Sequence, residues 1–387
     1  MKVKCRPEDF LVEELPTIAP GPSGRFTFYR LKKRGLGTIE AIDLVRRRWD
    51  LGPSQVRHGG LKDRHAETIQ YLSILNGPDR SLHEPRFSLE PLGRLTVPYG
   101  PSHFRGNRFV IVLRDLTPAE VERATREAAL IPRDGLPNYF DDQRFGSLTL
   151  SGEFSGHAWL VGDAEKALRL AIAEPCAHDR SPVKTIKSTL RACWGHWPEA
   201  KARLPRSHER SLVTYLVDHP TDFAGAFARL NRDLRSLYFS AFQSHLWNLL
   251  LGRWIEANTR PDQRLLHEFK AATLPIQRDL SEDQARTFGA TSLPLPCART
   301  KLAEGPLRDL ASDVLAPFGL TWEQMRVRRL DDVFFSKGLR AVVFRPERWS
   351  ASFAPDELHP GRSCCEVAFE LPKGAYATLV IKRLTDV

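Results

Sequence analysis

The sequence predicts an α+β fold in which a largely antiparallel sheet domain, made from both ends of the chain, is interrupted by a mostly helical insert. Segments rich in aromatic and β-branched residues, typical of strands, lie in the first 150 residues and return after residue 340. Helical periodicity with Pro-rich connections fills the middle. We therefore expect the sheet domain to comprise 1–154 and 331–387, and the insert to comprise 155–330.

Short runs with strand composition mark the sheet. The expected strands are 10–14, 25–30, 68–75, 108–113, 341–344 and 366–371.

Helix signals are strongest at two places near the N-terminus. Segment 39–49 has apolar residues at helical spacing, with Thr38 at the N-cap position and Gly52 shortly beyond its end. The run Thr117-Pro118-Ala119-Glu120 is a capping box with Pro at the first helical position, which predicts a helix to about residue 130. The further expected helices are 163–174, 222–257, 281–288, 307–315 and a closing helix at 376–384.

The charge balance favours a polyanionic partner. The chain has 57 Lys and Arg against 47 Asp and Glu, a formal net charge of +10. Lysines and arginines placed against phosphates release condensed counterions, which drives binding to nucleic acids. Basic residues cluster at 32–34, 46–48 and 326–329. One cluster alone fits a solvated face, whereas three clusters over both domains favour a groove that follows a folded RNA.

The remaining composition indicates a cytoplasmic protein without a membrane partner. The strongest apolar run, 246–251, is far shorter than the roughly 20 residues that span a bilayer. The first seven residues lack the apolar stretch of a signal peptide. Six scattered cysteines are typical of free thiols in a reducing compartment.

The segment 60–66, Gly-Leu-Lys-Asp-Arg-His-Ala, lies between two strand-like runs. Its residues fit a solvated polar turn. They also fit a carboxylate presented on a tight turn between two cations, Lys62 and Arg64. Because nearby cations favour the charged form, Asp63 would stay ionised and act as a nucleophile or general base. The residues alone leave both interpretations open.

Five blocks, in order along nearly the whole chain, resemble the motifs of the TruD family of tRNA pseudouridine synthases. The block 60–70, which contains Asp63, resembles the family signature, and the length resembles the bacterial branch. The other four blocks are Lys4 with 7–14, 137–140 with 143–146, 240–244 with Trp247 and Asn248, and 371–378.

The resemblance implies a pseudouridine-synthase-like sheet domain with a TruD-type insert, and a role for each matching residue. Asp63 would be the catalytic carboxylate and Lys4 its ion-pair partner. Phe10, Phe140 and Tyr376 would form walls around a flipped uracil, with Asn138 hydrogen-bonding in the same pocket. Without the motifs, Phe10 and Phe140 fit core positions, and Asn138 fits a turn.

The resemblance also implies the partner and the reaction. The expected substrate is tRNA, at uridine 13 of the D arm. The sequence leaves the oligomeric state open, and a monomer is favoured. The reaction needs no cofactor and no metal. Position 141 is Asp where the family usually has Gly, so Asp141 is expected to adopt a turn conformation that favours Gly. Tyr376 stands where Phe is frequent, and its hydroxyl would need a partner if buried.

Four alternatives compete with this interpretation. Four residues offer a zinc site with unfavourable spacing: Cys176, His178, Cys193 and His196. His65 suggests an Asp/His couple, and Asp141-Asp142 paired with Asp63 would suit an N-glycosidic hydrolase. A protein that binds or folds RNA without turnover is the non-enzymatic alternative.

Overall fold

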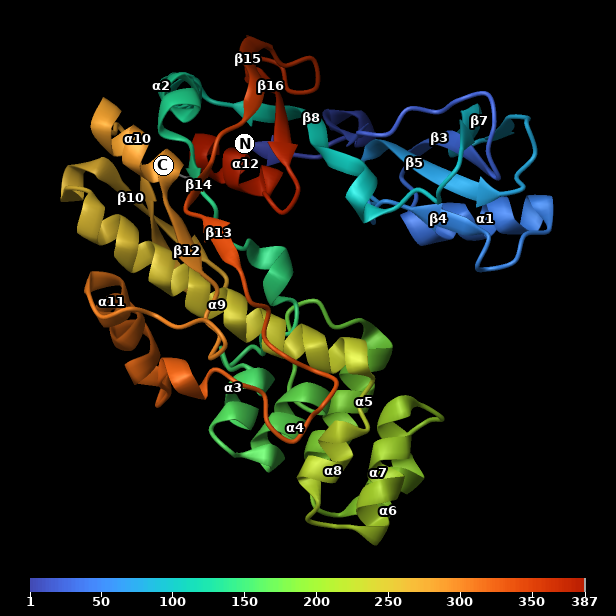
Figure 1. Cartoon of the computed structure of the whole chain (residues 1–387), viewed down its shortest axis with the longest axis vertical. Coiled ribbons are helices and arrows are strands. Elements are labelled where there is room, and N and C mark those ends of the chain that lie inside the picture. Colours follow the sequence, from blue (N-terminus) through green and yellow to red (C-terminus); the bar gives the residue numbers. More distant parts are fainter. Residues whose placement is uncertain (386–387) are drawn as a thin grey trace. The chain divides into compact units, whose positions relative to one another are not determined.

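The computed structural model describes residues 1–385, and they form two compact units (Figure 1). The first unit contains residues 1–136 together with the chain from Phe344 onward, and the second is Pro137–Val343. The expected boundaries at 154/155 and 330/331 both fall inside the second unit. Segment 137–154 packs in the second unit through Phe154, whose ring contacts Phe242. Strand β13, after the expected boundary at 330/331, pairs with β12 of the same unit.

The first unit is built on a ten-stranded sheet in the order β15-β16-β8-β2-β5-β3-β7-β6, with β1 on β8 and β4 on β5. Only β2 and β5 pair in parallel. Strand β16, from the C-terminal part, lies antiparallel to β8 and so joins the two chain ends in one sheet. The predicted α+β class with a largely antiparallel sheet is confirmed. The strands are β1 Lys2–Val3, β2 Phe10–Pro16, β3 Phe26–Arg34, β4 Val56–His58, β5 Glu67–Leu75, β6 Leu82–Glu84, β7 Phe87–Leu95, β8 Phe104–Leu116, β15 Glu347–Pro355 and β16 Ser363–Pro372.

Three α-helices belong to this unit: α1 Thr38–Trp49, α2 Pro118–Asp134 and α12 Ala377–Thr385. The prediction that Thr38 caps α1 is wrong, because Gly37 occupies the N-cap. The Thr38 hydroxyl instead donates to Gln70 Oε1 (2.8 Å) and accepts from the Lys62 backbone N–H (2.9 Å). It thereby holds the segment that carries Asp63.

Helix α2 begins where the capping box predicts. Thr117 Oγ1 accepts from the Glu120 N–H, and the Glu120 carboxylate accepts from the Thr117 N–H. The helix continues past residue 130 to Asp134, and Gly135 follows it at φ 65°, in the left-handed region that favours glycine.

The core of the sheet region follows from strand alternation. Tyr29 and Leu31 on β3 face α1 and pack with its Ala41 and Val45. Phe28, one residue away, faces the other side, where a smaller cluster contains Leu95, Tyr99 and Phe104. Successive strand residues point to opposite faces, so both sides of β3 are buried.

The second unit is organised around α9 Arg232–Asn258, whose residues are buried along most of its length. The expected helix 222–257 is two helices, because Asn231 caps α9 by accepting from the Asp233 N–H. The other helices are α3 Ser155–Leu160, α4 Ala164–Ile172, α5 Ser181–Ala192, α6 Trp197–Arg203, α7 His208–Asp218, α8 Phe223–Ala228, α10 Glu282–Ala290 and α11 Pro306–Leu315.

Short strands complete this unit. The hairpin of β10 Arg264–Phe269 and β11 Ala272–Gln277 was not predicted, and neither was the pairing of β12 Ser292–Pro294 with β13 Leu339–Ala341. Strands β9 Leu136–Pro137 and β14 Val343–Phe344 lie where the chain passes between the units. Single 3-10 turns across both units are η1 Pro7–Asp9, η2 Pro101–His103, η3 Asp142–Phe145, η4 Pro261–Gln263, η5 Ala316–Phe318 and η6 Trp322–Gln324.

Candidate active site

Strand directions bring three distant segments together around Asp63. Strands β2 and β5 are parallel, so the segments that precede them, containing Lys4 and Asp63, meet at one edge of the sheet. Strand β3 runs antiparallel to β5, so its last residues, including Lys33, reach the same edge. The sheet therefore gathers Lys4, Lys33 and Asp63.

Asp63 presents an accessible carboxylate to Lys4. Lys4 Nζ lies 3.1 Å from Asp63 Oδ2, so the expected ion pair is present, and the Asp63 side chain is 42% exposed. The Lys4 ammonium also lies 4.0 Å from the centre of the Phe10 ring, a favourable cation–π distance. Lys4 has φ 59°, a left-handed conformation that costs energy for a residue with a Cβ and is concentrated at functional sites.

Lys33 holds the backbone of Asp63 through a hydrogen bond from inside the unit. Its ammonium is buried and donates to the carbonyls of Leu36 (2.7 Å) and Asp63 (3.0 Å). Burial lowers the pKa of Lys33 to about 8, although the charge of Asp63 acts in the opposite direction. The assignment of Lys33 to a surface cluster is therefore wrong. Its position two residues after buried Leu31 on β3 is the sequence signal for an inward side chain.

Lys62, the neighbour of Asp63, points into the unit and binds Glu14. Their charged atoms lie 2.9 Å apart, and the side chains are 7% and 0% exposed. The second oxygen of Glu14 accepts from the Tyr99 hydroxyl (2.8 Å) and the Tyr71 N–H (3.3 Å). Burial and the Glu14 charge raise the pKa of Tyr99. A Cβ at Gly59 would come within 2.9 Å of Glu14 Oε1, so this close packing requires glycine.

The expectation that Asp63 sits between the cations of its own turn is therefore corrected. Lys62 is paired with Glu14, and Arg64 Nη1 lies 3.6 Å from Glu40. The cations that face Asp63 come from other segments, namely Lys4 and Lys33. His65 is exposed and forms no hydrogen bond with Asp63 in the part of the chain that the structure describes.

The N-terminal motif is fixed to the sheet through Asp9. The Asp9 carboxylate accepts from Arg114 Nη2 (2.7 Å) and from the Arg6 N–H (2.9 Å). Burial raises the pKa of Asp9, but these hydrogen bonds and charges outweigh it, and the pKa is lowered overall. Asp9 thus anchors the turn between Lys4 and Phe10.

The other predicted substrate residues of this unit are less exposed. Phe10 is buried and its ring meets the Phe109 ring edge-on at 6.3 Å. Tyr376 is half-buried and directly precedes α12. Their contact with a uracil stays a prediction.

Asn138 and Phe140 belong to the second unit. The Asn138 side chain donates to the Ala341 carbonyl (3.1 Å) and accepts from Arg340 Nη2 (2.6 Å). Arg340 Nε donates to the Asn138 carbonyl (2.8 Å). The amide therefore holds Arg340, and its predicted hydrogen bond to substrate remains untested.

The Arg340 side chain packs against two aromatic rings. Its guanidinium lies 4.2 Å from the centre of the half-buried Phe140 ring and 5.3 Å from that of Trp247. The Asn248 side chain clamps the backbone of Phe140, accepting from its N–H and donating to its carbonyl, each at 2.8 Å. The sequence pattern did not single out Arg340, because its partners are 202 and 200 residues away along the chain.

The prediction of a glycine-like conformation at Asp141 is wrong. Its φ is −85°, which any residue adopts, and it is buried before η3. The next residue, Asp142, accepts from the Lys270 N–H at 2.8 Å. Asp141 and Asp142 belong to the second unit, whereas Asp63, their partner in the hydrolase alternative, belongs to the first.

Among residues 1–385, no three His, Cys, Asp or Glu side chains are grouped as metal ligands would be. Of the four residues weighed for zinc, Cys193 is buried and Cys176 Sγ accepts from Lys187 Nζ at 3.4 Å. Within the same residues, no helix has the length and apolar character to cross a bilayer.

Known proteins are similar to this chain over nearly its whole length. A sequence profile of the family described as tRNA pseudouridine synthase D (TruD) matches residues 1–384. A protein of Methanococcus maripaludis named probable tRNA pseudouridine synthase D 1 is 26% identical, with 100% of both chains covered. A tRNA pseudouridine synthase D of Leptospira interrogans is also 26% identical, over 99% of this chain and 95% of the relative.

A solved structure agrees with the sequence comparison. The crystal structure described as TruD from Methanosarcina mazei superposes with a TM-score of 0.78 at 26% identity, covering 100% of this chain and 93% of that chain. The profile match and the superposition together assign the sequence and the fold of this chain to the same family. The chain belongs to the TruD family of tRNA pseudouridine synthases.

Proposed function

We propose that this protein isomerises uridine 13 in the D arm of tRNA to pseudouridine, with Asp63 as the catalytic carboxylate. Membership of the family supports the reaction and the class of substrate. The observation that carries the assignment of Asp63 is its exposed carboxylate, ion-paired with Lys4 on a turn that Lys33 and Lys62 anchor from within.

The chemistry fits one carboxylate. Pseudouridine formation breaks the bond between N1 of uracil and the sugar, turns the base, and forms a bond from C5 to the same sugar carbon. The C5 proton is lost and N1 gains one, so the reaction is redox-neutral. Asp63 can serve by attacking the base, attacking the sugar or removing a sugar proton. Lys4, 3.1 Å from Asp63 Oδ2, can orient the carboxylate for each of these steps.

Recognition requires the uridine to leave the stack. Extraction from the folded body of tRNA costs a few kcal/mol, and contacts to surrounding phosphates offset that cost. In the first unit we assign Phe10 and Tyr376 to contact with substrate. In the second unit we assign Asn138 and Phe140, which Arg340 and Asn248 hold in place.

Carbodiimide mapping of pseudouridine on unmodified tRNA tests the proposal. Incubation with the protein should create one new reverse-transcription stop, at position 13, and tRNA with cytidine at that position should give none. A stop in the anticodon or TΨC arm would overturn the substrate site but leave the chemistry. Release of free uracil would indicate the hydrolase alternative, and tight binding without product would indicate an RNA-binding protein.

A further inference from the structure

The three basic clusters of the sequence differ in how their charges are used. At 32–34, Lys33 is buried, Lys32 pairs with Glu67 and Arg34 pairs with Glu8. The positive charges of this cluster are therefore largely used in contacts within the protein.

The second cluster is similar. Arg46 pairs with Asp43 at 3.0 Å, and Arg48 pairs with Glu84 at 2.7 Å. Surface pairs of this kind contribute little to stability, but they reduce the positive charge available to a polyanion.

The third cluster is different. Arg326, Arg328 and Arg329 are exposed, and within residues 1–385 none of them forms an ion pair. Buried Met325 and Leu330 anchor the segment at both ends. The backbone is thus fixed while the three guanidinium groups face solvent.

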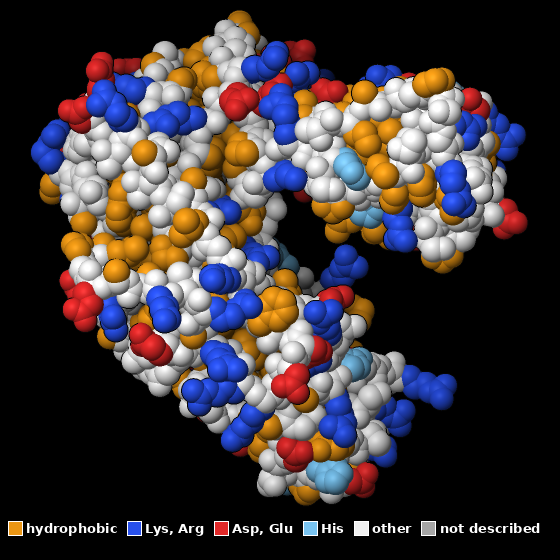
Figure 2. Space-filling view, viewed as in Figure 1, with side chains coloured by type: hydrophobic (Ala, Val, Ile, Leu, Met, Phe, Trp, Pro, Cys, Tyr) orange, Lys and Arg blue, Asp and Glu red, His pale blue; other side chains and the backbone are white. Residues whose placement is uncertain are grey.

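Two further features fix the conformation of the segment that carries these arginines. Trp159 Nε1 donates to the Arg328 carbonyl at 3.0 Å, which ties the segment to α3. Arg329 has φ 63°, a left-handed conformation that costs energy for a residue with a Cβ and turns the chain between Arg328 and buried Leu330. Figure 2 shows Lys and Arg side chains gathered on the part of the second unit around α3.

The three arginines line a hollow of about 310 Å³, which we call the arginine hollow. Its lining includes Trp159, Val161 and Ala224 beside the arginines, and none of its lining residues is a carboxylate. The volume lies at the lower end of the range for ligand sites. Three guanidinium groups around one hollow suit the anionic phosphates of a nucleic acid.

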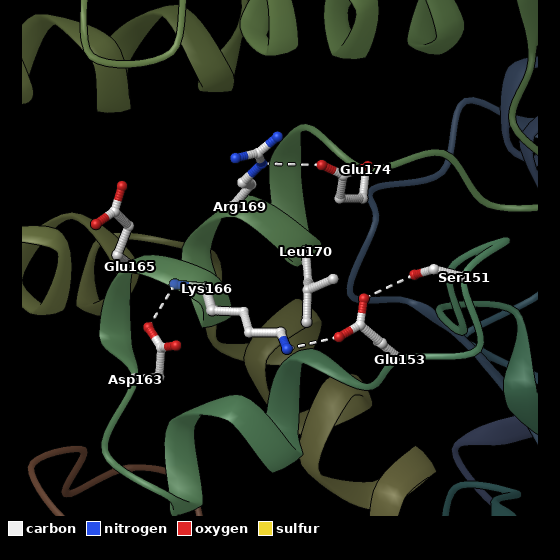
Figure 3. Close-up of a pocket in the computed structure, with 8 residues that line it drawn as sticks. All are labelled: Ser151, Glu153, Asp163, Glu165, Lys166, Arg169, Leu170 and Glu174. Atoms are coloured by element: carbon white, nitrogen blue, oxygen red, sulfur yellow. Dashed lines mark hydrogen bonds and ion pairs between the residues drawn. The ribbon is translucent and has the colours of Figure 1, made fainter.

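A larger hollow in the same unit shows the contrast. It has a volume of about 460 Å³ and four carboxylates among its lining residues (Figure 3). Its two cations are paired, Lys166 with Glu153 at 2.6 Å and Arg169 with Glu174 at 2.9 Å. That surface would repel a phosphate, whereas the arginine hollow would attract one.

We infer that the arginine hollow binds phosphates of the tRNA substrate. This inference rests on the proposed function for the identity of the RNA. Guanidinium groups bind phosphate oxygens in a fork geometry, and these three form no ion pair within residues 1–385 and have no carboxylate among the lining residues of the hollow, so their charge is available to RNA. The hollow thereby contributes affinity through the second unit, independently of the chemistry at Asp63.

The test replaces the three arginines by glutamine, R326Q/R328Q/R329Q, and measures the salt dependence of tRNA binding. Loss of three phosphate contacts should reduce the slope of log K against log salt by about 2 to 3. At about 0.1 M salt, affinity should fall by about 10- to 100-fold.

The matched control is R253Q/R260Q/R286Q, which removes the same charge from the same unit. These arginines are 63%, 67% and 76% exposed, and each is paired with a carboxylate. The control should keep the wild-type slope. An unchanged slope in the first variant, or equal losses in both, would overturn the inference.

Binding and turnover are scored separately so that the two proposals can fail independently. If the arginine variant loses affinity while wild type forms no pseudouridine, the hollow stands and the proposed function fails. If wild type modifies uridine 13 and the arginine variant binds tRNA like wild type, the hollow does not bind RNA. An acidic protein would then be the partner to examine.

Discussion

Lys62 and Glu14 form a buried ion pair, 2.9 Å long, directly beside an exposed catalytic candidate. The adjacent residue Asp63 turns to the surface, where its carboxylate meets Lys4. Lys62 therefore fixes the turn from inside the unit, and the next residue, Asp63, presents its carboxylate at the surface. The Lys62–Glu14 pair positions the turn, because Glu14 is itself held by Tyr99 and by the Tyr71 backbone.

Glu14→Gln should destabilise the first unit and lower turnover. The substitution leaves the Lys62 ammonium buried without its counter-charge, which costs about 3–5 kcal/mol when one partner of a buried pair is removed. Denaturant unfolding measures the loss. The control is Glu13→Gln, the same change one residue away, where Glu13 makes a partly exposed pair with Arg108. It should cost about 1 kcal/mol or less. Equal losses would show that the Lys62 pair has no special role.

Lys4→Asn should reduce turnover at saturating tRNA by about two- to fivefold, because the Lys4 ammonium orients the Asp63 carboxylate and a partly exposed ion pair is worth up to about 1 kcal/mol. Asn tolerates the left-handed backbone of Lys4, so the change removes the ammonium without adding strain. Lys2→Asn, which removes an exposed ammonium paired with Asp115, should be near wild type. Wild-type turnover by the Lys4 variant would remove Lys4 from the mechanism.

Lys33 should make stability rise with pH. Its folded pKa, about 8, lies below the ordinary value of 10.5, so between these values the unfolded chain binds more protons at this site. The free energy of unfolding of wild type, minus that of Lys33→Met, should therefore increase between pH 8 and 10.5, by up to about 3 kcal/mol. Unfolding of both proteins across this range measures the difference. A flat or falling difference would contradict the burial of a charged Lys33.

Phe140→Ala should raise KM or lower kcat by about 5- to 100-fold, the range expected for loss of one base-stacking contact. Phe334→Ala is the matched control, because Phe334 is an exposed ring with Arg299 5.3 Å from its centre in the same unit. Steady-state kinetics on tRNA should separate the two variants. Equal effects would leave Phe140 as an ordinary surface ring.

Local patterns predicted much of the fold. The α+β class, the cap of α2 at Thr117 and the strand around 68–75 follow from periodicity and turn chemistry within a few residues. The cap of α1 was misplaced because the Thr38 hydroxyl is used by Gln70 and Lys62, which are distant in sequence. Tertiary hydrogen bonds override a local capping preference.

The site, like the fold, contains residues that local patterns predict and residues that only the tertiary structure reveals. Asp63 and Lys4 were predicted through the motifs, but the partners of Lys62 and Lys33 depend on which strands pair. The inward positions of Glu14 and Lys33 were available from the two-residue period of β2 and β3, on which each follows buried apolar residues. Arg340 was beyond such reasoning, since only the folded unit brings it to Asn138 and Phe140.

The most direct test of the central claim is pseudouridine formation by Asp63→Asn on unmodified tRNA, mapped by carbodiimide and paired with a binding measurement. Asparagine keeps the shape of the side chain but supplies no carboxylate to attack or to accept a proton. The variant should give no stop at uridine 13 while binding tRNA within a few-fold of wild type, because phosphate contacts dominate affinity. Product formation at a rate near that of wild type would show that Asp63 is not the catalytic carboxylate.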